Sequence, residues 1–165
     1  MSNFLNKNFV INFFIILSIF GLDRFSKVYV ISKNEKNLSS ELFVSKYLNI
    51  ELVWNEGIAF GLLSFNQSYF YNILTILIVV IIIIIFFMLL KSDGFRKYSF
   101  LMIFGGALGN LYDRIFFKAV PDFVDFHIGN FHWFIFNVAD IFISLGIICL
   151  IFDEMFFNKN NNEEN

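Results

Sequence analysis

Residues 69–90 read YFYNILTILIVVIIIIIFFMLL, and this stretch decides the fold class. It contains no charged side chain, and from Ile73 onward Thr75 is its only polar residue. About 20 residues of helix, at about 1.5 Å rise per residue, cross the roughly 30 Å hydrocarbon core of a bilayer. A run of isoleucine and valine also suits a buried strand, but this run is too long for one. We therefore predict a transmembrane helix here.

Three further apolar segments, at 9–31, 98–117 and 134–156, each contain polar residues toward one end. Each is long enough to span a bilayer if those polar side chains face the protein interior or the interface. The first segment has a basic residue before its apolar core, as a signal peptide does, but Asp23 and Arg24 stand where a cleavage site would follow. We therefore keep it as a helix. The expected fold is an all-α membrane protein with four transmembrane helices.

The composition of the whole chain agrees with this prediction. Of its 165 residues, 58% are hydrophobic and 16% are charged, and the mean hydropathy is +0.68, whereas about a quarter of the residues in soluble domains are charged. The length suits one domain, which we place at 1–157, followed by a disordered polar tail at 158–165. The net charge of -2 gives no basic surface, so nucleic-acid binding is not expected. The single cysteine, Cys149, excludes a disulfide framework.

The loops between the segments predict an orientation. Residues 91–97 contain three basic side chains, which places this loop, and with it both termini, in the cytoplasm. The other two loops, at 32–68 and 118–133, then lie on the outer side of the membrane. Residues 38–66 hold short β-prone stretches that end at the turn-forming sequence NEG at 55–57. We expect a small β-sheet there, on the outer surface of the membrane.

Polar and ionisable residues collect at the outer ends of these segments. Asp23 and Lys27 are four residues apart and share a helical face, as do Asn110, Asp113 and Arg114. An ionisable group inside a membrane costs at least about 2.5 kcal/mol, so such groups are expected to face one another or water. The other members at this depth are Asn55, Asp122, Asp125, Asn137 and Asp140. We predict a polar site near the outer face of the membrane.

Simpler interpretations exist for several of these features. Asp23, Arg24 and Lys27, taken alone, are typical of an ordinary helix-end anchor. Gly105 and Gly109 form a G-x-x-x-G pair, which favours close helix packing. Ser26 and Lys27 are adjacent in a helix and do not face each other, which argues against a Ser-Lys nucleophile.

Two histidines and an acid invite comparison with metal sites. His127 and His132 lie near Asp125 in the sequence, but their spacing is not the H-E-x-x-H pattern of a zinc-binding helix. Two histidines at a membrane interface are usually only polar residues. We therefore predict no metal ion and no cofactor.

Four carboxylates remain as candidates for chemistry, namely Asp113, Asp122, Asp125 and Asp140. Two carboxylates at short range cannot both ionise, so they share one proton. The ionised one can take a proton from water while the protonated one donates a hydrogen bond to an amide carbonyl. Such a pair hydrolyses a peptide bond without a protein nucleophile or a metal.

Five blocks, in order along the chain, resemble the motifs of the bacterial lipoprotein signal peptidases, also called signal peptidase II. They extend from Asp23 to Asp140, over most of the chain. Any one block is weak, but the ordered set is highly specific. The blocks are DRFSK at 23–27, NEGIAF at 55–60, GGALGNLYDR at 105–114, VPDFVDF at 120–126 and FNVAD at 136–140.

The resemblance implies an aspartic endopeptidase of the bacterial cytoplasmic membrane. Such an enzyme removes the signal peptide of a prolipoprotein by cutting before a cysteine that carries diacylglycerol. By motif position, Asp122 and Asp140 would be the catalytic pair. The resemblance further implies prolipoproteins and membrane lipids as partners, and a monomer suffices for a site built from one chain.

The resemblance also implies supporting roles for other positions. Asn55 and Gly57 would belong to an outer loop that covers the active site. Asp23 and Lys27 would hold the first helix against the site. The residues expected to orient the catalytic pair and bind the substrate backbone are Asn110, Asp113, Arg114, Asn137 and Ala139.

Two positions depart from the family pattern. Pro121 precedes Asp122 and removes one backbone donor beside that carboxylate. Lys118 stands near a position where glycine is common. Neither change removes a carboxylate, but together they leave Asp113 and Asp125 open as alternatives to Asp122.

Two other classes of function remain open from the sequence. A small membrane transporter or proton-coupled channel subunit would also hold intramembrane acids. It would need polar groups along a path to both faces, whereas the inner halves of the predicted helices are nearly bare. A structural scaffold would explain the helices but not four acids at one depth.

Overall fold

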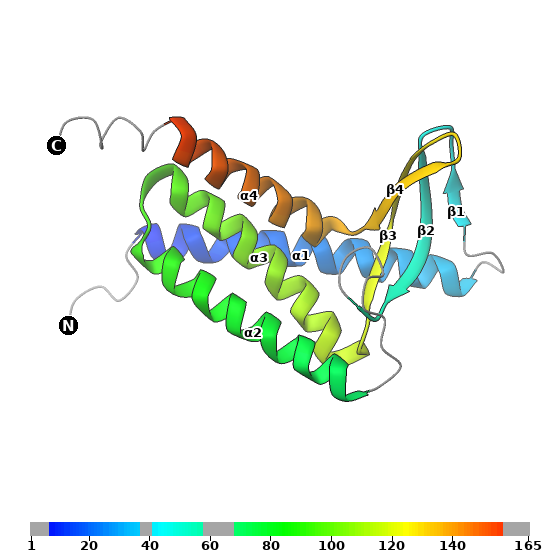
Figure 1. Cartoon of the computed structure of the whole chain (residues 1–165), viewed down its shortest axis with the longest axis horizontal. Helices are drawn as coiled ribbons and strands as arrows, with labels where there is room; N and C mark the ends of the chain where they lie inside the picture. The colour runs from blue at the N-terminus through cyan, green and yellow to red at the C-terminus, as the bar shows by residue number, and fades with distance from the viewer. Residues whose placement is uncertain (1–6, 37–40, 58–67, 157–165) are drawn as a thin grey trace.

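A computed structural model describes residues 7–36, 41–57 and 68–156 of the chain. Within these residues the chain forms four helices and one antiparallel sheet of four strands in the order β1-β2-β3-β4. The helices run side by side, and the sheet stands across one end of the bundle (Figure 1). The helices are α1 (Lys7–Lys36), α2 (Ser68–Lys91), α3 (Gly94–Phe117) and α4 (Val138–Phe156). The strands are β1 (Glu41–Val44), β2 (Leu48–Asn55), β3 (Val120–Ile128) and β4 (Phe131–Phe136).

The bundle carries its apolar side chains on the outside as well as in the core. Of the described helices, α1 and α2 are long and apolar enough to cross a membrane. In α2, Ile76 and Leu90 are 64% and 63% exposed, and many of their neighbours are similarly open. An apolar surface of this extent is stable in lipid and not in water.

Small residues bring α3 close to its neighbours. A Cβ placed on Gly105 would lie 3.0 Å from the Cβ of Ile19 in α1. A Cβ placed on Gly109, the other member of the G-x-x-x-G pair, would lie 2.5 Å from Oδ2 of Asp23 in the same helix α1. The G-x-x-x-G pair therefore does serve close helix packing, as the sequence suggests.

The sheet is larger than the sequence predicts. Strands β1 and β2 lie within the expected outer region 38–66, but β3 and β4 come from the segment between α3 and α4. The predicted start of the fourth helix at residue 134 is wrong, because 134–136 belong to β4. The apolar run of β4 continues into that of α4, so hydropathy alone does not mark the boundary between them. Asn137 marks it, as the helix cap described below.

The first helix is also longer than predicted. It continues to Lys36, so Asp23 and Lys27 lie within α1 and not at its end. The polar tail at 158–165 and the part of the predicted covering loop at 58–67 lie outside the described residues.

Candidate active site

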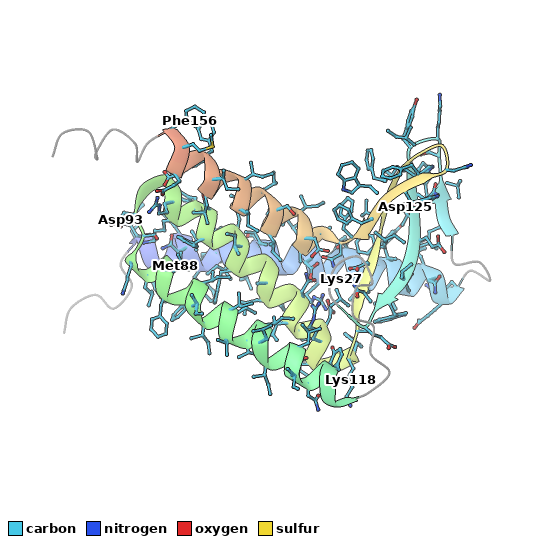
Figure 2. All side chains as sticks on the ribbon, viewed as in Figure 1. Lys27, Met88, Asp93, Lys118, Asp125 and Phe156 are labelled. Carbon is cyan, nitrogen blue, oxygen red and sulfur yellow. The ribbon has the colours of Figure 1, made fainter. Side chains whose placement is uncertain are left out.

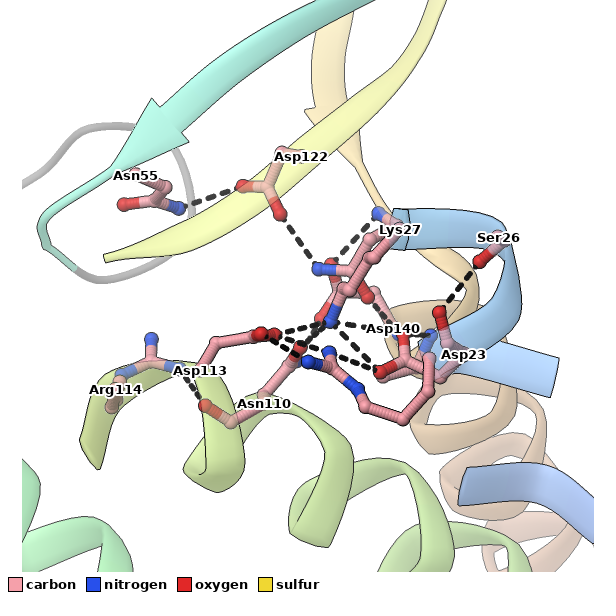
Figure 3. Close-up of polar contacts among 12 residues, drawn as sticks. Asp23, Ser26, Lys27, Asn55, Asn110, Asp113, Arg114, Asp122 and Asp140 are labelled. Carbon is pink, nitrogen blue, oxygen red and sulfur yellow. Dashed lines mark hydrogen bonds and ion pairs between the residues drawn. The ribbon is translucent and has the colours of Figure 1, made fainter. Parts of the chain in front are cut away.

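A buried ionic cluster joins α1 to α3 at the end of the bundle that faces the sheet (Figure 3). The Nζ atom of Lys27 donates to Asp113 at 2.7 Å, to the side-chain oxygen of Asn110 at 2.8 Å and to Asp23 at 3.0 Å. Asp23, Lys27 and Asp113 are all 0% exposed. The helix-end anchor interpretation is therefore wrong, because an anchor keeps its charge in water or at the lipid headgroups.

Arg24 is also a member of this cluster, although the sequence analysis assigned it only to the helix-end anchor and not to the candidate site. Its guanidinium donates through two nitrogens to the two carboxylate oxygens of Asp113, one of them at 2.6 Å, and also to Asp23 at 2.8 Å. The cluster then contains two carboxylates and two cations and is neutral, which is the condition for burying charge at tolerable cost. The sequence does contain a signal for this role of Arg24, because an ionisable residue within an apolar helix is expected to have an oppositely charged partner.

The first turn of α4 explains the F-N-x-A-D spacing. The side-chain oxygen of Asn137 accepts from the backbone N–H of Asp140 at 3.2 Å, and the Asp140 carboxylate accepts from the backbone N–H of Asn137 at 3.1 Å. This reciprocal pair is a capping box, which needs the cap and its partner to be three positions apart, with two residues between them. Between them, the N–H of Ala139 donates to Asp23 at 3.1 Å, so the ionic cluster also holds the start of α4.

Strand β3 places Asp122 beside the start of α4. One oxygen of Asp122 accepts from the amide nitrogen of Asn137 at 2.6 Å, and the other accepts from that of Asn55 at 2.9 Å. Burial is the largest cause that raises the pKa of Asp122, and the charge of Asp140 acts in the same direction, while the hydrogen bonds from Asn55 and Asn137 oppose the shift; the resulting pKa is about 6. Asp122 can therefore hold a proton near neutral pH, which an ordinary aspartate does not.

Three asparagines are each held so that the amide nitrogen faces one of the two acids. Asn137 uses its oxygen in the helix cap, and Asn55 uses its oxygen to accept from the N–H of Gly57 at 2.9 Å. Asn110 accepts from Lys27 through its oxygen and donates to Asp140 at 2.8 Å through its nitrogen. The orientation of each amide is thus fixed by a second contact, and both carboxylates receive donors from defined directions.

A cavity of about 320 Å³ opens between the sheet and the bundle. Asp122 and Asp140 both line it, and so do the three asparagines. Its remaining lining residues are Arg114, Val120, Phe134, Ile135, Ile143 and Ser144. Two carboxylates with a fixed set of amide donors in one partly apolar cavity are suited to acid–base hydrolysis.

A family model described as signal peptidase (SPase) II matches residues 15–156 of the chain. The chain belongs to the signal peptidase II family. It is therefore a peptidase, and the fold agrees with the membrane location of that family.

Individual relatives agree with the family assignment. The chain is 53% identical over 160 residues to a lipoprotein signal peptidase of Pelagibacter ubique (strain HTCC1062), an alignment that covers 96% of each chain. It is 35% identical over 153 residues to a lipoprotein signal peptidase of Francisella tularensis subsp. mediasiatica (strain FSC147), with 90% of this chain and 94% of the relative covered. It resembles a solved structure described as a bacterial membrane enzyme, with a TM-score of 0.70, 31% identity and 90% of each chain covered.

The structure separates the four acids that the sequence left as candidates. Asp122 and Asp140 line the cavity, whereas Asp113 is engaged by Arg24 and Lys27 in the buried cluster. Asp125 lies on the sheet, where it contacts His132 at 2.8 Å. In this signal peptidase II chain, one pair of acids therefore shares the cavity.

Arg114 lines the cavity and also contacts Gly57, which lies just after the end of β2 and before the predicted covering loop. Its guanidinium donates to the carbonyl oxygen of Gly57 at 3.2 Å and to that of Asn110 at 3.3 Å. The hydroxyl of Tyr71 donates to the carbonyl oxygen of Arg114 at 2.9 Å, which adds α2 to the site. Tyr71 is a second contact that the sequence analysis missed.

The two departures from the signal peptidase II pattern fit the backbone. Pro121 lies opposite Trp54 of β2, and β4 pairs with β3 only from Val124 onward, so the missing N–H falls where one side of β3 is unpaired. Lys118 adopts the left-handed conformation, with φ 56° and ψ 18°, at the end of α3. This conformation is the usual reason for a glycine at a helix end, and here a lysine adopts it.

Proposed function

We propose that the protein removes signal peptides from prolipoproteins and that Asp122 and Asp140 are its catalytic pair. The family and its close relatives support the reaction. The observation that supports this pair is that both carboxylates line one cavity and are joined through Asn137. Residues 1–157 act as one peptidase domain in this proposal.

The reaction follows from a pair of carboxylates that shares one proton. The ionised member takes a proton from a water molecule, and the protonated member donates a hydrogen bond to the carbonyl oxygen of the peptide bond. The water oxygen then attacks the carbonyl carbon and forms a tetrahedral intermediate. Transfer of a proton to the leaving nitrogen breaks the C–N bond and returns the pair to its starting charge.

The neighbouring residues fix the geometry of this pair. Asn110 and Asn137 hold the carboxylate of Asp140, while Asn55 and Asn137 hold that of Asp122. Arg114 supports the substrate backbone at the mouth of the cavity. Positioning of this kind contributes to rate because no reorganisation of donors is needed as charge develops.

The substrate is a prolipoprotein whose cysteine carries diacylglycerol, and cleavage occurs before that cysteine. The apolar exterior of the bundle lies in the bacterial cytoplasmic membrane as four transmembrane helices, with both termini in the cytoplasm. The sheet and the cavity then lie at the outer face, where the lipid-bound end of the substrate is anchored. A monomer is sufficient, since every member of the site comes from one chain.

A cleavage assay in detergent micelles tests the proposal. The purified protein is mixed with a diacylglyceryl-modified prolipoprotein and, separately, with the unlipidated precursor, and products are separated by gel mobility. Asp122→Asn and Asp140→Asn are each expected to slow cleavage by about 10²–10⁴-fold with the fold retained. Asp153→Asn is the matched control, because Asp153 pairs with Arg96 far from the cavity. Cleavage at the original rate by either of the first two variants would exclude this pair.

The transporter hypothesis receives no support from the comparisons. The Pelagibacter and Francisella relatives described above are both peptidases by name, and no observation in the described residues favours transport.

A further inference from the structure

Strands β3 and β4 bring three possible metal ligands together away from the catalytic cavity. His127 of β3 lies directly opposite His132 of β4, and Asp125 precedes His127 by two residues on the same strand. One ligand atom from each of the three lies within 4.8 Å of the other two. Figure 2 labels Asp125 on the sheet, apart from the cluster around Lys27 in the bundle. The H-E-x-x-H criterion applied to the sequence is specific to helices and does not detect ligands that a hairpin brings together.

The distances between the three side chains suit coordination. The Asp125 carboxylate lies 2.8 Å from Nδ1 of His132 and 3.7 Å from Nδ1 of His127. Two ligands of a tetrahedral zinc ion, each at about 2.0–2.2 Å from the metal, are about 3.4 Å apart. The observed separations lie on either side of that value, so small side-chain rotations suffice.

The second observation concerns the hydrogen bonding of His127. Its side chain is 10% exposed, and its Nδ1 atom has no hydrogen-bond partner among the residues that the structure describes. A buried polar atom without a partner destabilises the folded state, because it loses its hydrogen bonds to water and gains none in return. The unpaired nitrogen faces the same carboxylate that His132 contacts, so a cation between them would satisfy all three groups.

The geometry points to a binding site for one divalent transition-metal ion, of the zinc type, formed by Asp125, His127 and His132. Two imidazoles and one carboxylate are a ligand set typical of zinc, and a fourth position remains for water. His132 is 55% exposed in its side chain, which gives an ion access from solvent.

Neighbouring groups support these ligands. Asn49 of β2 lies 3.5 Å from the Asp125 carboxylate, and the backbone N–H of His127 donates to the carbonyl oxygen of Tyr47 at 3.1 Å. The ion would tie β4 to β3, the strand that also carries Asp122. This site does not depend on the proposed peptidase function, and its test does not use cleavage.

Direct metal binding tests the site. The full chain is purified in detergent with an affinity tag that contains no histidine, stripped with a chelator and titrated with zinc chloride against a colorimetric zinc indicator. The chain has two histidines and one cysteine, so the background from other strong ligands is small. Cobalt chloride serves as a second probe, because tetrahedral cobalt absorbs in the visible range.

The expected result is one zinc ion per chain and a dissociation constant in the micromolar range or below. His132→Ala should weaken binding at least about tenfold and should fold normally, since this side chain is largely exposed. His127→Gln should do the same, and Cys149→Ser should bind as the original protein does. Zinc should raise the melting temperature of the original protein and, at the same zinc concentration, raise that of His132→Ala by less. Absence of stoichiometric binding, or equal binding by His132→Ala, would overturn the proposal.

Discussion

Gly106 of α3 faces the carbonyl oxygen of Ala139 in α4 so closely that a Cβ at residue 106 would lie 2.6 Å from that oxygen. The neighbouring backbone is the first turn of α4, which carries Asp140. Gly106→Ala should therefore displace this turn, destabilise the protein by about 1–3 kcal/mol and slow cleavage. Melting temperature in detergent and the cleavage rate measure the two effects.

Gly21→Ala is the matched control for that substitution. Gly21 lies within α1, and a Cβ placed there meets nothing within 4 Å. Alanine is favoured over glycine inside a helix by about 0.5–1 kcal/mol, so this variant should be slightly more stable and fully active. If Gly21→Ala lost as much stability and activity as Gly106→Ala, the close contact with Ala139 would not explain the loss.

Lys27→Met should be among the most destabilising substitutions. It removes one of two cations from the buried cluster and leaves Asp23 and Asp113 facing only Arg24. Loss of one partner from a buried ion pair costs about 3–5 kcal/mol. Denaturation in mixed micelles measures this loss.

Arg96→Gln is the comparison for that prediction. Arg96 pairs with Asp153 and Glu154, but its side chain is 39% exposed. An exposed ion pair contributes about 0–1 kcal/mol, so the variant should unfold nearly as the original does. A large loss of stability in Arg96→Gln would mean that burial does not explain the difference between the Lys27 cluster and the Arg96 ion pairs.

Asn137→Ala should lower the cleavage rate by about 10²–10³-fold, the usual effect of removing one oriented donor in an active site. The same change removes the cap of α4 and should cost about 1 kcal/mol of stability. Asn72→Ala is the control, because Asn72 is an exposed amide on α2. The effect should fall mainly on kcat, since Asn137 orients the acids.

The raised pKa of Asp122 predicts a dependence of stability on pH. Its folded-state pKa of about 6 exceeds the ordinary value of 3.8, so the folded protein binds the proton more tightly than the unfolded chain does. This contribution, about 3 kcal/mol, is complete below about pH 4 and is lost as the pH rises through about 6. The melting temperature of the original protein should therefore fall, relative to Asp122→Asn, between pH 4 and pH 7. A constant difference between the two proteins would contradict the prediction.

Cleavage should also decline on the alkaline side. The mechanism needs one shared proton, and the pair loses it as the pH rises above the pKa of Asp122, about 6. The value of kcat/KM should then fall with increasing pH, with a slope approaching tenfold per pH unit. A rate profile that is flat from pH 6 to pH 9 would exclude a shared-proton mechanism.

Much of the fold follows from local sequence. The charge-free run at 69–90 identifies α2, and the i, i+4 spacing of Asp23 and Lys27 correctly places them on one face. The cap at Asn137 is also a local signal, because Asn-x-x-Asp before an apolar run is a capping pattern. The prediction treats Asn137 as a site residue inside an apolar segment and not as a cap, so it places the start of the fourth helix too early.

Long-range pairing is what the sequence alone did not reveal. Strand β3 pairs with β2, although α2 and α3 lie between the two strands in the sequence. No property of residues 120–136 by themselves specifies that pairing. The role of Arg24 depends on Asp113, which arrives on a different helix. The assembly of Asp125, His127 and His132 depends on the register of a hairpin that was not predicted.

The neutral cluster between α1 and α3 has a consequence for the biogenesis of the protein. The ribosome completes α1 before α3, so Asp23, Arg24 and Lys27 reach the membrane with one uncompensated positive charge. A helix in that state inserts poorly. Its charge is balanced only when α3 supplies Asp113. Because Asp23 of the same cluster also accepts from the N–H of Ala139, the contact that neutralises α1 is coupled to the position of the first turn of α4.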